Sequence, residues 1–251
     1  MEIGYTVKQL DEHTWQIEET NHRLGVYCYL LEGENRAILI DSGLGNIDLG
    51  GIVAGLTEKP VAVVNTHSHG DHIAGNADFA ERYIAKEDLE GYARDASGKG
   101  PGPLPRPVPL EITGIDDGHV FDLGGRTLRV YLTPGHSNGS ICILDVERRQ
   151  LFTGDTCGRG EVLAFAAQHG LPGYRRSMQR ILDLGSEYDL TWPAHGETPI
   201  GKDVLLRLTK LADDILAGKI EEKSFENPHF KGYVCAHREE LGIVYPPFAR
   251  G

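Results

Sequence analysis

The segment "NTHSHGDHIAG", residues 65–75, places three histidines and an aspartate within six positions: His67, His69, Asp71 and His72. It overlaps the end of "VAVVN" (61–65), a short apolar and β-branched run that is typical of a strand covered on both faces. A protein core struggles to satisfy so many polar groups, whereas imidazole and carboxylate groups are the usual ligands of zinc. The segment therefore predicts a metal site at the carboxyl end of a buried strand.

The overall composition is that of an ordinary globular protein. The chain has 251 residues, of which 40% are hydrophobic and 25% charged, so it can bury a full core. A formal net charge of −12 argues against a broad surface for nucleic acid or for an anionic membrane. The first residues, "MEIGYTVKQLDEHTWQIEE", lack the pattern of a signal peptide, and no apolar stretch approaches the roughly 20 residues of a membrane helix. We expect a cytoplasmic protein whose partner is a small molecule, not a nucleic acid or a membrane.

The four cysteines are scattered, with no CxxC pair among them: Cys28, Cys142, Cys157 and Cys235. Such spacing indicates reduced thiols in the cytoplasm rather than a disulfide framework. We expect three of them to pack as small core residues. Cys157 has a second interpretation because it lies two residues after Asp155 in "FTGDT".

Apolar patterns predict the elements of the first half of the chain. Alternation predicts a strand at 14–19, and a hairpin follows with strands at 26–31 and 36–40. The elements expected after the hairpin are a helix at 45–56, the strand at 61–65, a helical stretch at 75–83, a short strand at 84–85 and a helix at 86–96. The segment 97–110 is rich in proline and glycine, which predicts a long surface connection between two halves of the fold or beside the active site.

The second half repeats this organisation. The expected elements are a hairpin at 119–133 with a Gly124-Gly125 turn, a hairpin at 139–155, a helix at 173–184 after a loop at 158–173, a strand at 189–195, a helix at 202–218 closed by Gly218, and a strand at 232–236. Hairpins with helices in each half predict two facing sheets covered outside by helices, a four-layer αββα sandwich of the α/β (α+β) class. We expect residues 1–251 to form a single domain, with a core at about 14–217 and a C-terminal tail at 218–251.

Further metal-capable residues lie at the ends of other predicted strands. Side chains at positions i and i+2 of an extended segment point the same way, so His67 and His69 could hold one ion. Around the next turn, Asp71 and His72 could face a second ion. The remaining ligands are expected after distant strands, and three residues stand there: His136 in "LTPGHSNGS", Asp155 in "LFTGD" and His195 in "TWPAH". The alternative, a hydrogen-bonded loop cluster without a metal, does not account for this placement.

The order of these residues resembles the metallo-β-lactamase superfamily, whose signature is HxHxDH followed by a distant His, Asp and His. The match runs through roughly residues 25 to 200, and Asp41 in "ILIDSG" is similar to the family's early aspartate, which helps to order the site. The resemblance implies a metallo-β-lactamase fold with a dinuclear site between the two sheets. An ordinary role for Asp41 in capping a turn or a helix is the competing interpretation.

The resemblance also implies a role for each ligand. One metal would be held by His67, His69 and His136, the other by Asp71, His72 and His195, with Asp155 bridging the two. Paired cations lower the pKa of a bound water, so that a metal-bound hydroxide attacks a polarised carbonyl or phosphoryl centre. Asp71 would orient this nucleophile as the catalytic residue. Two Zn²⁺ ions per chain are the expected cofactors, and iron or manganese fit the same ligand types.

Three other features have both a functional and a structural interpretation. Cys157 could be a weak ligand near the metals, but packing is the stronger expectation. The pair Arg175 and Arg176 could bind an anionic substrate, or form a solvated helix face. The side chain of His22 could project over the pocket or be exposed in a turn. The histidines outside the motif are assigned no role: His13, His119, His169, His229 and His237.

Members of this superfamily differ in substrate. The flavin-linked di-iron branch typically has glutamate where this chain has His69, and RNA-processing members carry additional binding modules. The motifs "FTGDT" and "PAHGE" look similar to the thioesterase and lactonase type. We therefore expect a hydrolase of a small-molecule ester, thioester or lactone. Two alternatives are hydrolysis of a β-lactam amide, and the chemistry of persulfide dioxygenases, which use a single iron. The oligomeric state is not predicted.

Overall fold

Two β-sheets face each other in the computed structural model, which describes residues 3–21, 25–100, 104–166, 168–227 and 231–248. The first sheet has the strand order β1(Gly4–Asp11), β2(Thr14–Thr20), β3(Gly25–Glu32), β4(Ala37–Ile40), β5(Val61–Val64), β6(Glu81–Ala85) and β7(Thr113–Ile115). Its pairs are antiparallel from β1 to β4 and parallel from β4 to β7. The second sheet has the order β13(Leu190–Pro193), β11(Gln150–Gly154), β10(Ile141–Asp145), β9(Thr127–Leu132) and β8(Val120–Asp122).

The main hydrophobic core fills the space between these sheets. Leu31, Ile40 and Val64 from the first sheet pack in one cluster with Val130 and Phe152 from the second. The β8–β9 hairpin turns at Gly124 and Gly125, whose φ angles of 81° and 65° suit a two-residue turn of type I′. The predicted hairpins at 119–133 and 139–155 are confirmed by the antiparallel pairs β8–β9 and β10–β11.

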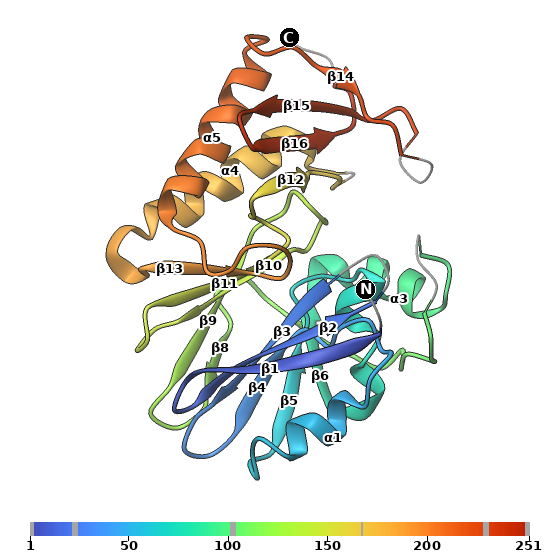
Figure 1. The fold of residues 1–251 in the computed structure, drawn as a ribbon, viewed down its shortest axis with the longest axis vertical. Coiled ribbons are helices and arrows are strands. Elements are labelled where there is room, and N and C mark those ends of the chain that lie inside the picture. The colour runs from blue at the N-terminus through green and yellow to red at the C-terminus, as the bar shows by residue number, and fades with distance from the viewer. Residues whose placement is uncertain (1–2, 22–24, 101–103, 167, 228–230, 249–251) are drawn as a thin grey trace.

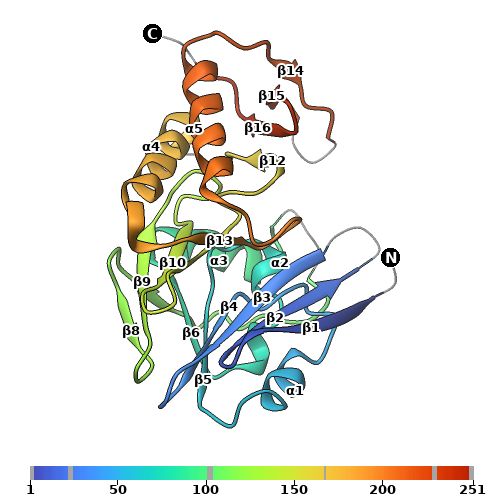
Figure 2. The same ribbon diagram turned by 60° about the vertical axis from the view of Figure 1, so that its left-hand side comes forward.

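Helices cover the outer face of each sheet. On the first sheet lie α1(Leu49–Ala54), which packs on Leu30 and Leu39, and α3(Leu89–Ala96), which packs on Ile84. On the second lie α4(Gly170–Asp183) and α5(Lys202–Leu216), which bury Leu144 and Leu151. The views in Figure 1 and Figure 2 show α1 at one end of the molecule and α4 with α5 toward the other. The four-layer αββα sandwich is thereby confirmed.

A third, smaller sheet joins the C-terminal segment to the middle of the chain. Its order is β12(Gly160–Leu163), β16(Leu241–Tyr245), β15(Val234–Arg238) and β14(Lys223–Ser224). Strand β12 pairs in parallel with β16, and residues of both pack in the same cluster as α4 and α5. Both views show this sheet beside α5, at the end of the molecule away from α1. The strands β14, β15 and β16 are thus joined to the rest of the protein through β12.

Three sequence predictions about elements were wrong. The stretch 75–83 is a single 3-10 turn, Asn76–Asp78, followed by β6, because Glu81 to Tyr83 pair in parallel with the buried strand β5 and this pairing overrides local helix preference. The helix expected at 45–56 begins only at Leu49, after Asp48 caps it by accepting a hydrogen bond from the Gly51 amide. The loop expected at 158–173 contains β12 and the start of α4.

The proline-rich segment lies beside the histidine-rich turn. In the described part of 97–110, Arg106 makes two hydrogen bonds of 2.7 and 2.8 Å to Asp78 and a third to the carbonyl of Ala74. These contacts fix the segment against the short helix α2(Gly70–Ile73). Within the described ranges, no helix combines the length and the apolar character needed to cross a bilayer.

Candidate metal centre

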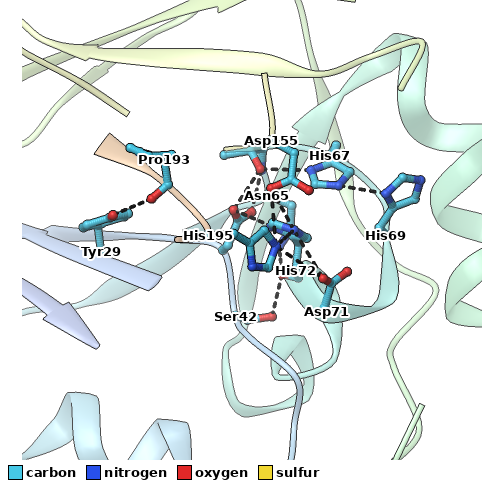
Figure 3. Close-up of polar contacts among 12 residues, drawn as sticks. Tyr29, Ser42, Asn65, His67, His69, Asp71, His72, Asp155, Pro193 and His195 are labelled. Carbon is cyan, nitrogen blue, oxygen red and sulfur yellow. Dashed lines mark hydrogen bonds and ion pairs between the residues drawn. The ribbon is translucent and has the colours of Figure 1, made fainter. Parts of the chain in front are cut away.

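The seven residues predicted as ligands converge at one edge of the sandwich, each just after a strand. The turn after β5 and the helix α2 supply His67, His69, Asp71 and His72. The other three follow strands of the second sheet: His136 after β9, Asp155 after β11 and His195 after β13. Figure 3 shows side chains from both sheets pointing toward one another across this edge.

Three imidazoles form the first cluster. The Nε2 atom of His67 lies 3.0 Å from Nδ1 of His69 and 3.1 Å from Nε2 of His136. The distance between His69 Nδ1 and His136 Nε2 is 2.8 Å. Three nitrogen atoms of this kind around one point are the donor set of a tetrahedral zinc site with one position open.

The second cluster contains Asp71, His72 and His195. The Oδ2 atom of Asp71 lies 3.4 Å from Nε2 of His195 and 3.8 Å from Nε2 of His72. The side chains of Asp71 and His195 are each 26% exposed, while His72 is fully buried. This cluster therefore opens to solvent on the side of Asp71 and His195.

Asp155 lies between the two clusters. Its Oδ2 atom is 3.4 Å from Nε2 of His136 in the first cluster. Its Oδ1 atom is 3.5 Å from Nε2 of His72 and 3.4 Å from Nε2 of His195 in the second. One carboxylate thus presents one oxygen to each cluster.

Hydrogen bonds on the far side of the rings fix which nitrogen faces the centre. The Nδ1 atom of His136 contacts the carbonyl of Leu163 at 2.8 Å, and Nδ1 of His195 contacts the carbonyl of Gly25 at 2.6 Å. A carbonyl can only accept, so Nδ1 carries the proton in both rings. Nε2 of both rings therefore faces the cluster and is the atom that a metal would bind.

A buried oxygen without a donor tests whether the site suits a cation. Among the described residues, none donates a hydrogen bond to Oδ1 of Asp155. Its nearest nitrogens are Nε2 of His72 at 3.5 Å and Nε2 of His195 at 3.4 Å, both longer than an ordinary hydrogen bond. A buried carboxylate in this position needs positive charge between itself and the rings, and a metal ion held by all three groups supplies it. The donor set therefore fits a pair of divalent metal ions.

A buried network holds the motif turn in place. Both carboxylate oxygens of Asp41 are used: Oδ1 accepts from the Thr66 amide at 2.7 Å, and Oδ2 from the Thr66 hydroxyl at 2.8 Å and from Nδ1 of His72 at 2.9 Å. The backbone of Asp41 has a φ of 60°, a strained conformation for a non-glycine residue. The side-chain amide of Asn65 and the hydroxyl of Ser42 donate to the backbone carbonyl of His72 (Figure 3). Asp41 thus supports both the turn and a ring of the second cluster.

The glycine before Asp155 permits a close approach of the two sheets. Gly154 has a φ of 49°, and a Cβ atom there would lie 2.5 Å from Oγ1 of Thr66. That hydroxyl belongs to the Asp41 network. Any side chain at 154 would therefore push Asp155 and the motif turn apart.

Strand β3 positions the segment that carries His195. The hydroxyl of Tyr29 donates to the carbonyl of Pro193 at 2.6 Å (Figure 3), and the amide of Tyr27 donates to the carbonyl of Ala194 at 2.8 Å. With the bond from His195 to Gly25, three contacts fasten the end of β13 to the opposite sheet. Sequence patterns do not reveal these partners, because all three acceptors and one of the donors are backbone groups.

Electrostatics differ between the two clusters. Burial and the neighbouring His136 lower the pKa of His69 to about 3, and burial with the surrounding histidines lowers the pKa of His67. Burial alone would lower the pKa of His195 as well, but Asp155 and Asp71 raise it to about 9. The pKa of His72 is raised well above its usual value, since Asp41, Asp155 and Asp71 outweigh its burial. In the first cluster His67 and His69 are thus neutral imidazoles, whereas the second cluster attracts positive charge.

The two central carboxylates stay ionised for the same reason. Burial would raise the pKa of Asp71, but His72 and His195 lower it below its usual range. For Asp155 the opposing charges of His195, His72 and His136 have the same effect. Both groups therefore present negative charge to the centre of the site.

Two clefts lead to this centre. The β12 cleft, about 360 Å³, is lined by residues that include Asp71, His136, Asp155, Arg159, Glu161 and His195. The α3 cleft, about 680 Å³, shares His136 with it and includes His69, Arg94, Phe165 and Tyr233 in its lining. Sequence analysis missed Arg159, Glu161, Phe165 and Tyr233. They come from β12, from the residues just before and after it, and from the C-terminal segment, none of which carries a recognisable motif.

Three of the residues for which the sequence allowed a functional or a structural role can be placed in the structure: Cys157, Arg175 and Arg176. Cys157 lines the β12 cleft but is 2% exposed; burial raises the pKa of its thiol to about 11, and its Sγ lies 3.3 Å from the Thr153 hydroxyl. Arg175 pairs with Asp213 and so joins α4 to α5, while Arg176 is exposed on α4. His22 lies outside the described residues.

Comparisons with known proteins agree with this geometry. The family model described as the Metallo-beta-lactamase superfamily matches residues 23–195. The chain is 27% identical over 238 residues to "Acyl-coenzyme A thioesterase MBLAC2" of Homo sapiens, covering 81% of this chain and 85% of that protein. It is 34% identical over 181 residues to "Lactamase-like protein nscB" of Neosartorya fischeri, covering 70% and 49%. Among solved structures, the metallo-beta-lactamase from Pontibacter korlensis has the same fold, with a TM-score of 0.67 at 20% identity over 84% of this chain and 100% of that one.

Proposed function

The chain belongs to the metallo-beta-lactamase superfamily and is a metal-dependent hydrolase, and we propose that it uses two metal ions to hydrolyse small-molecule thioesters, esters or lactones. The observation that carries the two-ion proposal is the position of Asp155. Its two oxygens reach two separate groups of histidines, at 3.4 Å to His136 and 3.4 Å to His195. A single ion would leave one of these groups without a cation.

Each ion would have its own ligands. We assign His67, His69 and His136 to one, and Asp71, His72 and His195 to the other, with Asp155 shared between them. When bound, two divalent cations lower the pKa of water toward neutrality and polarise a carbonyl oxygen. Zinc suits this donor set, and iron or manganese are the alternatives.

Asp71 is the proposed catalytic residue. Its carboxylate is partly exposed in the β12 cleft, and its low pKa keeps it ionised. It can therefore accept a hydrogen bond from a water molecule in the cleft and orient it toward a substrate carbonyl. Asp71 lies beside the imidazole rings of His72 and His195. A water molecule that it orients is therefore close to the residues that would hold the second ion.

Leaving-group chemistry favours a thioester. The water oxygen forms the new bond to the acyl carbon, the C–S bond breaks, and the sulfur takes the bonding electrons as a thiolate. A thiol has a pKa near 8.5, so its thiolate leaves without prior protonation, whereas an amine must be protonated first. One proton of the water finally reaches the sulfur, and the other leaves the carboxylic acid product. A site whose proposed catalytic group is a carboxylate of low pKa suits this reaction better than amide hydrolysis.

An acyl-coenzyme A is the first substrate class to test. The human relative is named as an acyl-coenzyme A thioesterase, and the alignment covers 85% of it. The two clefts share His136, so together they offer space for the parts of a thioester substrate on either side of the bond that is cleaved. We propose that these clefts take the acyl and thiol portions of such a molecule.

The cellular setting is also a proposal. All four cysteines are buried and unpaired, which supports a reducing compartment such as the cytoplasm. The parallel pairing of β12 with β16 supports treating residues 1–251 as one domain. A small molecule, rather than nucleic acid or a membrane, remains the proposed partner.

The test combines metal analysis with a substrate panel. Purified protein should contain two zinc, iron or manganese ions per chain by mass spectrometry, and should hydrolyse acyl-coenzyme A thioesters or simple thioesters and lactones faster than a β-lactam. Faster opening of the β-lactam would make it an amide hydrolase. One iron per chain, with oxygen consumed in the presence of a persulfide, would overturn the hydrolase proposal.

A further inference from the structure

A second group of metal-ligating side chains lies on the third sheet, outside the candidate centre. Glu161 comes from β12, and Cys235 and His237 come from β15. One ligand atom of each lies within 4.8 Å of the others. We propose that these three side chains, here called the rim site, bind a divalent transition-metal ion such as Zn²⁺. This inference does not depend on the proposed function.

The sheet register brings the three side chains to one face. Cys235 and His237 are two residues apart on β15, so their side chains point the same way. His237 is paired with Gly242 of β16, and Gly242 is paired in turn with Glu161 of β12. The three ligands thus span three adjacent strands on the same side of the sheet.

Gly242 provides the space that lets the ligands meet. A Cβ atom at this position would lie 2.5 Å from Cδ2 and 2.7 Å from Nε2 of His237, and 3.2 Å from Cγ of Glu161. The imidazole therefore lies across the bare backbone of β16 to reach β12. His237 Nε2 and Glu161 Oε1 are 2.9 Å apart as a result.

The chemistry of the three groups selects the ion. A thiolate, an imidazole and a carboxylate together suit zinc and similar borderline ions, not calcium or magnesium, which prefer oxygen alone. The side chains of Glu161 and His237 are 43% and 41% exposed, so an ion can enter, while Cys235 is 6% exposed. Burial and Glu161 raise the pKa of the Cys235 thiol, so ion binding would release its proton.

The rim site is connected to the candidate centre through β12. Glu161 also lines the β12 cleft, and two residues further on, the carbonyl of Leu163 accepts the hydrogen bond from His136. An ion at the rim site would tie β12 to β15 and add positive charge to the wall of the cleft. It would thus act on both the orientation of His136 and the charge that a substrate meets.

Cobalt(II) is the appropriate probe because thiolate ligation gives it a near-ultraviolet charge-transfer band that nitrogen and oxygen ligands do not give. Co²⁺ is added to the holoenzyme with its own metals in place. The band should appear and saturate at one equivalent per chain. It should be absent in Cys235→Ser, and His237→Gln should weaken Co²⁺ binding about tenfold or more.

Two further variants make the result decisive. Gly242→Ala keeps all three ligands but displaces the His237 ring, so it should also weaken Co²⁺ binding. Cys157→Ser removes the thiol that lines the β12 cleft next to Asp155, and it should leave the band unchanged. No band in the wild-type protein, a band that survives Cys235→Ser, or one that disappears with Cys157→Ser would each overturn the rim site while leaving the hydrolase proposal intact.

Discussion

The Nδ1 atom of His72 donates a hydrogen bond of 2.9 Å to Oδ2 of Asp41, and the two side chains are 0% and 1% exposed. This contact determines which ring nitrogen of His72 faces the second cluster, since the proton is held on Nδ1. Asp41 also accepts two hydrogen bonds from Thr66, so it connects the ligand to the backbone of the motif turn. A residue that ligates nothing thus orients the site.

Asp41→Asn should weaken the second cluster while keeping the fold. Asparagine tolerates the left-handed backbone at this position, but its neutral amide is a poorer acceptor for the His72 ring. We expect a fall of about 10- to 100-fold in metal affinity or in kcat/KM. Competition with a chelator, followed by mass spectrometry, measures the affinity. Metal affinity and activity equal to those of the wild-type protein would contradict the role assigned to Asp41.

Asp71→Ala should separate catalysis from folding. The side chain is partly exposed on the first turn of α2, so its loss leaves the core intact. Turnover should fall by about 100-fold or more, because the water is no longer oriented. The circular dichroism spectrum should stay close to that of the wild-type protein, and any fall in the melting temperature should not exceed the fall caused by chelation. His136→Ala is the comparison: it should lose bound metal together with activity. Full activity of Asp71→Ala would refute the mechanism.

Removal of metal should lower stability as well as activity. The ligands come from four separate strand ends, so ions bind the folded protein and not the unfolded chain. At a thousandfold excess over its Kd, one ion contributes about 4 kcal/mol to the free energy of unfolding. For a chain of this length, chelation should therefore lower the melting temperature by roughly 10 °C for each ion removed. Re-addition of zinc should restore both properties; an unchanged melting temperature would argue against bound ions.

The sequence predicted the ligands of the candidate centre better than it predicted the groups that orient them. The seven proposed ligands could be found because each follows a recognisable strand and all of them stand in the known order of a family motif. Of the groups that orient these ligands, the family resemblance indicated Asp41, but the sequence did not reveal the backbone acceptors. The rings of His136 and His195 are held by the carbonyls of Leu163 and Gly25, and a backbone carbonyl has no residue type that a sequence pattern could reveal.

The errors about the fold have a similar cause. The residues around 81–85 have no strong strand pattern of their own, and they form β6 because they pair with β5. Strand β12 exists because residues 160–163 meet 241–244 from the far end of the chain. The rim site depends on the same pairing: Glu161 and His237 are 76 positions apart, and nothing in their local sequence connects them.

A buried ion pair joins the start of β9 to the end of β10, at the opposite end of these strands from the candidate metal centre. We expect it to make a large contribution to the free energy of unfolding. Arg126 and Asp145 are 1% and 0% exposed, and the guanidinium makes hydrogen bonds of 2.9 and 2.6 Å to the same carboxylate oxygen. Asp145→Asn would leave a buried cation without its counter-charge, so it should lower the free energy of unfolding by about 3–5 kcal/mol. Urea denaturation measures the loss, and metal content should not change.

The exposed pair formed by Arg149 and Asp189 is the matched control. It has the same chemistry, with two hydrogen bonds of 2.8 and 2.6 Å, but side chains that are 44% and 65% exposed. Because solvent screens such a pair, Asp189→Asn should lower the free energy of unfolding far less than Asp145→Asn does. The double variant Arg126→Met with Asp145→Asn should lose less than Asp145→Asn alone, since it removes the stranded charge. Equal losses from the buried and the exposed aspartate would show that burial of the charge is not what makes Asp145 important.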